Sequence, residues 1–199
     1  MTANWNSARV NQLTSPLLRL PAELRNLIYL FTFTDSMIRM HPQKGEQSAT
    51  NPIGLICCCR QLHREANSLF YTTATFEMEM ALPYSYEAAI VAIGAERCAR
   101  ITSIQISLLS VEFQYVHWAY PAKSFEEEIE LQGRANANAF PALNTVHVKG
   151  SRLQLSLLSS DTRADLVRAF RLVHGKPAIE IVFEAGLEGI LRAADDGQP

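Results

Sequence analysis

The sequence predicts an α+β protein in which an N-terminal helical module is followed by a small mixed or parallel β-sheet covered by helices. Two segments before residue 80 have apolar residues at three- and four-residue spacing, which is typical of helices. Strand-like runs centred near Ile104, Val146 and Ile181 follow, separated by helical segments, and this alternation favours crossover connections. The apolar content of 48% in 199 residues is ample for a core.

Composition excludes several kinds of partner. Lys and Arg total 18 against 20 Asp and Glu, so the net charge of -2 provides no basic field for nucleic acid or for an anionic membrane surface. The first fifteen residues lack the apolar run of a signal peptide, and no later run approaches the roughly 18 residues of a membrane helix. Three of the four cysteines are adjacent at 57–59, which indicates reduced thiols. We therefore expect a soluble protein of the cytoplasm or nucleus.

The first predicted helix begins at Pro21, after a flexible tail over residues 1–15. Proline at the start of a helix loses no bond that the helix needs, and Glu23 lies in the first turn, where the helix dipole favours negative charge. One apolar stripe follows at helical spacing and consists of Leu20, Leu24, Leu27, Ile28 and Phe31. Because Tyr29, Leu30 and Phe33 widen that stripe, we expect this helix to need two neighbours, one in its own module and one from another chain.

The remainder of the module, which we place at residues 16–80, contains a second helix. Residues 34–52 are rich in turn formers and predict a loop or a hairpin. The second helix is expected from about Pro52 to Phe70, with one apolar face formed by Leu55, Cys58, Cys59, Leu62, Ala66, Leu69 and Phe70. Alternating apolar and acidic residues then predict a strand between Thr72 and Met80.

Residues 81–199 are predicted to form a C-terminal α/β region that binds a partner. Its segments alternate in type. Helices are expected over 86–98, over 126–139, from an N-cap at Asp161 to a stop at His174 and Gly175, and over 187–194. Strands are expected over 101–109, near Val146 and over 178–183.

The two N-terminal segments match the first and second halves of one motif in both order and spacing. The first contains Leu18, Leu20, Pro21, Glu23, Leu24, Arg25, Asn26, Ile28 and Tyr29, and the second contains Cys59, Arg60, Gln61, Leu62, Glu65, Ala66, Phe70, Tyr71 and Phe76. In this respect residues 15–80 resemble the F-box-like proteins that are abundant in fungi. The resemblance implies a compact helical module whose first helix docks on the Skp-type adaptor of a cullin-RING ubiquitin ligase.

Helix geometry is compatible with such docking. Helices that dock on a partner use apolar anchors at positions i, i+3, i+4 and i+7, and a proline at the first turn reduces the cost of ordering it. The candidate adaptor-binding residues are Leu18, Leu20, Pro21, Leu24 and Ile28. The alternative is that all five belong to the core of their own module.

The region that selects a target is less defined. The segment FPALNTVHVKG, residues 140–150, is similar to a leucine-rich-repeat turn and strand, as in many substrate-binding halves of F-box proteins. The densest aromatic stretch contains Phe113, Tyr115, Trp118 and Tyr120. These side chains are either buried under the sheet or form a target-binding surface on a loop.

Catalytic and metal chemistry is not indicated. Cys59 and His63 are four residues apart, but a structural zinc site needs four ligands and no second pair has a matching spacing. No G-x-S-x-G elbow or phosphate-binding glycine loop occurs. We therefore expect no enzymatic activity, no metal and no cofactor. The hypothesis is a substrate receptor that joins an unknown protein target to the adaptor, and the alternative is a stand-alone scaffold in which the motif is a stable core.

Overall fold

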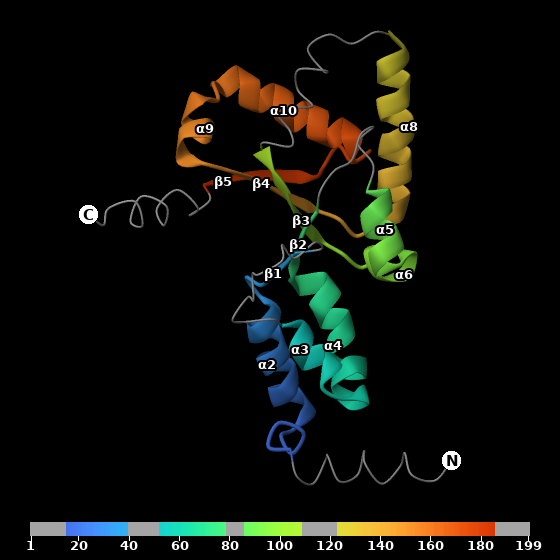
Figure 1. Ribbon diagram of the computed structural model, residues 1–199, viewed down its shortest axis with the longest axis vertical. Coiled ribbons are helices and arrows are strands. Elements are labelled where there is room, and N and C mark those ends of the chain that lie inside the picture. The colour runs from blue at the N-terminus through green and yellow to red at the C-terminus, as the bar shows by residue number, and fades with distance from the viewer. Residues whose placement is uncertain (1–14, 40–51, 79–85, 109–122, 186–199) are drawn as a thin grey trace, which may run out of the picture. The chain divides into compact units, whose positions relative to one another are not determined.

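The computed structural model describes residues 15–39, 52–78, 86–108 and 123–185, with the backbone alone over 123–130 (Figure 1). Eight helices and five strands lie in these described ranges, and the predicted α+β class is confirmed. The chain forms two compact units that divide after Thr75. The helix predicted over 187–194 lies outside the described residues.

The first unit is mainly helical. Helices α2 and α3 both contact α4, and a short strand β1 follows α2; the bounds are α2 (Ala22–Phe33), β1 (Met37–Arg39), α3 (Ile53–Cys57) and α4 (Arg60–Thr73). Strand β2 (Thr75–Glu77) begins at the last residue of this unit, where the Thr75 N–H donates to the Ser36 carbonyl oxygen at 3.0 Å. Strand β2 is shorter than the strand predicted between Thr72 and Met80, because α4 continues through Thr73.

Helix α2 begins where the sequence predicts. Pro21 is its N-cap, with φ of -52° and ψ of 150°, and the Pro21 carbonyl accepts the Arg25 N–H at 3.1 Å. The helix ends before Asp35, whose φ of 61° lies in the left-handed region and turns the chain toward β1. Proline at the entry and a left-handed residue after the exit therefore fix both ends of the helix.

The prediction of one helix over 52–70 is wrong in one respect, because this segment forms two helices, α3 and α4. Cys59 has an extended backbone, with φ of -157° and ψ of 164°, and it is the N-cap of α4. Cysteine is a modest helix former, so three in succession offer little resistance to a break. The break allows Ile56 to be buried and leaves Cys57 and Cys58 exposed, so these two thiols do not pack as core residues.

The second unit contains a parallel sheet. Its strands β3 (Ser103–Ser107), β4 (Thr145–Gly150) and β5 (Glu180–Ala185) are parallel, and Val146 pairs with Ile104 on one side and Ile181 on the other. The end of β2 lies beside β3, where the Met78 N–H donates to the Gln105 carbonyl at 2.9 Å, so the strand order is β2-β3-β4-β5. The parallel pairing agrees with the predicted crossovers.

Five helices of the described residues accompany this sheet. They are α5 (Glu87–Ile93), α6 (Ala95–Cys98), α8 (Lys123–Ala139), α9 (Arg152–Leu157) and α10 (Ser160–Val173). Gly94, with φ of 91°, divides the predicted 86–98 helix into α5 and α6. Helix α9 was not predicted, although Ser151 and Gln154 form a capping box at its start. The N-cap of α10 is Ser159, two residues before the predicted Asp161.

The end of α10 packs closely on α8 (Figure 1). Gly175 has φ of 59°, and the N–H groups of Gly175 and Lys176 donate to the carbonyls of Leu172 and Arg171 as in a Schellman motif. A Cβ on Gly133 of α8 would lie 2.3 Å from the Leu172 carbonyl oxygen, so only glycine fits this contact. The predicted stop at residues 174 and 175 is therefore confirmed.

A buried polar pair lies in the core of the second unit. The Tyr86 hydroxyl is 2.9 Å from His174 Nε2, and His174 Nδ1 is 2.7 Å from the Phe170 carbonyl oxygen. Because a carbonyl only accepts, Nδ1 carries the proton and Nε2 accepts from the tyrosine. Burial lowers the pKa of His174 to about 4, so its ring is neutral near pH 7. Both groups are thus satisfied within the core.

Candidate functional site

Helix α2 has apolar residues on two opposite sides. Tyr29 and Phe33 are buried, whereas Leu24 is 47% exposed and Phe31 is 79% exposed. An α-helix advances about 100° per residue, so Leu24, Leu27, Ile28 and Phe31 share one side, roughly half a turn from the buried pair. We call these four residues the exposed strip.

The buried side of α2 packs against α4. The rings of Phe33 and Phe70 meet edge to face, with centroids 5.3 Å apart and an interplanar angle of 76°. Aromatic pairs in this arrangement stabilise a core beyond the area that they bury. Leu62 and Ala66 of α4 are also buried, so the internal face of the module is already filled by aromatic and aliphatic groups.

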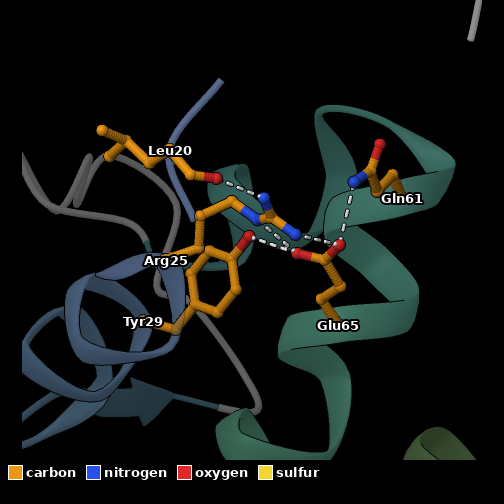
Figure 2. A network of polar contacts seen from close by, with 5 residues as sticks. All are labelled: Leu20, Arg25, Tyr29, Gln61 and Glu65. Atoms are coloured by element: carbon orange, nitrogen blue, oxygen red, sulfur yellow. Dashed lines mark hydrogen bonds and ion pairs between the residues drawn. The ribbon is translucent and has the colours of Figure 1, made fainter. Parts of the chain in front are cut away.

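A polar network beside this core fixes α2 relative to α4 (Figure 2). The Arg25 guanidinium donates from Nε to Glu65 Oε2 and from Nη2 to Glu65 Oε1, both at 2.8 Å. Its Nη1 donates to the Leu20 carbonyl oxygen at 2.6 Å. The Tyr29 hydroxyl donates to Glu65 Oε2 at 3.0 Å, and Gln61 Nε2 donates to Oε1 at 2.9 Å. Four donors therefore converge on one carboxylate.

Electrostatics keep this network charged near pH 7. The hydrogen bonds from Arg25 lower the pKa of Glu65, and the same pair raises the pKa of Arg25. Burial, followed by the bond to Glu65, raises the pKa of Tyr29 to about 12, which keeps its hydroxyl protonated as a donor. The side chains of Arg25 and Glu65 are only 11% and 26% exposed, so water screens their attraction less than at an open surface.

The network determines which side of α2 remains uncovered by the first unit. Bidentate Arg–carboxylate pairs are directional, so Arg25 and Glu65 set the rotation of α2 about its own axis. Tyr29 belongs both to this network and to the buried face. With that rotation fixed, the exposed strip cannot turn inward without breaking the network.

The structure separates the predicted adaptor-binding residues. Leu18 is buried and Leu20 is half-buried, whereas Pro21, Leu24 and Ile28 are exposed. Leu18 and Leu20 thus contribute to the module itself, and the other three share the surface of α2. The predicted target-binding residues Phe113, Tyr115, Trp118 and Tyr120 lie outside the described residues.

No family model, curated protein or solved structure matches this chain. Two residues of the strip, Leu27 and Phe31, belong to the predicted apolar stripe but were not among the predicted adaptor-binding residues. Leu30 on the same helix is exposed as well. The sequence contained a signal of this exposure, because the apolar residues of α2 cover more than one side of the helix and only one side can face the module.

Other chemistry at described residues is limited. Within residues 15–39, 52–78, 86–108 and 131–185, no group of three or more His, Cys, Asp and Glu side chains is placed to hold a metal ion. His63, four residues after Cys59, is exposed on α4. His147 on β4 bonds to Glu184 at 2.7 Å and is partly exposed, as expected for the solvent face of a strand. No helix of the described ranges is long and apolar enough to cross a membrane.

Proposed function

We propose that this protein is a non-enzymatic substrate receptor of the F-box-like kind, acting in the cytoplasm or nucleus. Its exposed strip docks on a Skp-type adaptor of a cullin-RING ubiquitin ligase, and its second unit selects a protein target. One observation supports this most: four large apolar side chains on α2 point away from the module that the helix stabilises. Contiguous apolar surface on a helix is typical of a protein-binding face.

The strip has the composition and spacing of a helix-docking surface. Leu24, Leu27, Ile28 and Phe31 occupy positions i, i+3, i+4 and i+7 of α2. Phe31 is the most exposed of the four, and buried aromatic anchors dominate the energetics of many interfaces. The Arg25–Glu65 network holds the helix in place before binding, which lowers the ordering cost of association.

A second candidate function has an observation of its own. Arg25, Tyr29, Gln61 and Glu65 are all motif residues, and all four are used inside the module. Part of the motif therefore encodes the packing of α2 on α4 and does not by itself require an adaptor. A stand-alone interaction protein with the same core is the alternative, in which the strip binds another protein.

Co-purification tests the proposal directly. Wild-type protein should retain a purified Skp-type adaptor, and the double variant Leu24→Asp with Phe31→Asp should lose it, because two charges would be buried at the interface. Leu153→Asp is the matched control, since Leu153 is an exposed apolar residue of α9 in the second unit. Absence of adaptor binding by the folded wild-type protein would refute the receptor function and favour the alternative.

A further inference from the structure

A groove runs along one face of α10 in the second unit. It has a volume of about 960 Å³ and is lined by α10, by Arg134 of α8 and by the chain that follows α10. On α10 the lining positions recur every three or four residues, which places them on one side of the helix: Ala164, Val167, Arg168, Arg171 and Leu172.

The groove is strongly basic although the chain as a whole is not. Five cationic residues line it, namely Arg134, Arg163, Arg168, Arg171 and Lys176, and no acidic residue is among the described residues of its lining. Asp165 approaches Arg168 at 3.5 Å, but this pair is exposed and contributes little. A chain with a net charge of -2 has thus concentrated five cations in one concave site, which favours anionic groups there.

Two of the cations are held by the protein itself. Arg163 donates to the Leu155 carbonyl at 2.7 Å, and Lys176 donates to the Pro141 and Leu143 carbonyls at 2.7 and 2.8 Å. These bonds fix the walls of the groove.

The other three cations are better placed to meet a ligand. The side chains of Arg134, Arg168 and Arg171 are exposed, and Arg171 contacts the Ile179 carbonyl only through Nε at 3.5 Å. An exposed guanidinium suits a bidentate carboxylate contact.

The rest of the lining indicates the class of ligand. Ala164, Val167, Leu172 and Pro177 give the groove an apolar component. No aromatic side chain is among the described residues that line it, so it offers no platform on which bases would stack. Apolar patches between arginines fit a peptide with mixed side chains better than a nucleic acid.

The distribution of charge indicates separate carboxylates. The basic lining extends along α10 from Arg163 to Arg171, which are eight residues or about 12 Å apart along the helix axis. An extended peptide covers that length in about four residues. Carboxylates on several side chains of such a peptide can reach cations along this whole length, whereas a single phosphate group can reach only some of them.

We infer that this groove binds an extended acidic segment of a partner protein. Asp and Glu side chains of the segment contact Arg134, Arg168 and Arg171, and intervening small apolar residues pack on Val167 and Leu172. The inference rests on the proposed receptor function in one respect, since it names the chemical class of the target that the second unit selects.

Fluorescence anisotropy with the full-length chain, and with no adaptor present, tests the inference. The probe is a fluorescein-labelled peptide of about twelve residues in which Asp or Glu alternates with Val or Ala. A second peptide with Asn and Gln at the acidic positions is the matched probe, and it should bind at least about tenfold more weakly. Raising the salt concentration should weaken binding of the acidic peptide, because its contacts are ionic.

Charge-reversal variants locate the site. The double variant Arg134→Glu with Arg168→Glu should lose affinity about tenfold or more, while Arg152→Glu, an exposed arginine of α9 outside the groove, should stay within about twofold. The milder pair Arg134→Gln with Arg168→Gln should also weaken binding, and circular dichroism verifies that each variant is folded.

Several results would overturn the inference. These are equal binding of the neutral peptide, wild-type affinity in the folded double variants, or displacement of the peptide by inorganic phosphate. Tighter binding of a single-stranded oligonucleotide that displaces the peptide would assign the groove to nucleic acid instead. Adaptor binding is measured separately through α2, so failure at the groove and failure of the receptor function are distinguishable.

Discussion

Replacing Glu65 by Gln removes one charge from the network between α2 and α4 and preserves the size of the side chain. In the wild-type protein this carboxylate accepts four hydrogen bonds, from Arg25, Tyr29 and Gln61. In the variant, the amide nitrogen of the new residue would face a donor, and Arg25, which is only 11% exposed, would lose its counter-charge.

The expected cost is about 2–3 kcal/mol in the free energy of unfolding. Hydrogen bonds to charged groups contribute about 1.5–3 kcal/mol, and breaking a fully buried ion pair costs about 3–5 kcal/mol. The Glu65 side chain is 26% exposed, which places this pair below the fully buried range. Glu96→Gln is the matched control, because Glu96 is 86% exposed and pairs with Arg100 only on the surface of the protein. That variant should cost about 0–0.5 kcal/mol.

Urea denaturation followed by circular dichroism measures both variants. Arg25 lowers the pKa of Glu65 in the folded state, so its stabilisation is present above the ordinary pKa of glutamate and is lost as pH falls toward the lowered value. The difference between wild type and Glu65→Gln should therefore be largest near pH 7 and shrink in acid below about pH 4.5. Equal stability of Glu65→Gln and Glu96→Gln at pH 7 would show that the network does not stabilise the packing of α2 on α4.

Three further predictions concern the second unit and the tyrosine of the network. Gly133→Ala should destabilise the protein by about 2 kcal/mol or more, because its Cβ would meet the Leu172 carbonyl oxygen at 2.3 Å. Gly54→Ala is the control and should be neutral or slightly stabilising, since no atom lies within 4 Å of its Cβ. Thermal unfolding compares the two variants. The pKa of His174, lowered to about 4, should make stability fall by up to about 3 kcal/mol as pH drops from about 6.5 to 4, and His174→Gln should reduce this slope in denaturant titrations. Because the pKa of Tyr29 is raised to about 12 in the folded protein, stability should fall as pH rises from about 10 to 12. If Tyr29→Phe loses stability with pH as steeply as the wild type, Tyr29 is not the group responsible.

The sequence predicts the first helix well and its buried side poorly. Pro21 and the periodic leucines indicate where α2 begins and that it is apolar around much of its surface. The side that faces inward depends on partners distant in sequence, because Phe33 packs on Phe70 and Tyr29 bonds to Glu65, 36 residues away. These two contacts, and not the apolar pattern of α2 itself, decide which side of the helix is buried.

Element types in the second unit were predictable, whereas several of its boundaries were not. The alternation around Val146 and the His174–Gly175 stop are local signals, and both agree with the structure. The contact of Gly133 with Leu172 joins two helices and leaves no local pattern. The basic groove was not predicted for the same reason, since Arg134 and Arg171 come together only when α8 and α10 pack. Helix α9 is a different case, because its capping box was visible in the sequence.

Photo-crosslinking at position 31 tests most directly whether the exposed strip is the adaptor-binding surface. Phe31 is replaced by p-benzoylphenylalanine in the full-length chain, and the same amino acid at position 153 serves as the control on α9. We expect a covalent product with a purified Skp-type adaptor from position 31 and none from position 153. No product from position 31, or equal products from both positions, would contradict this expectation.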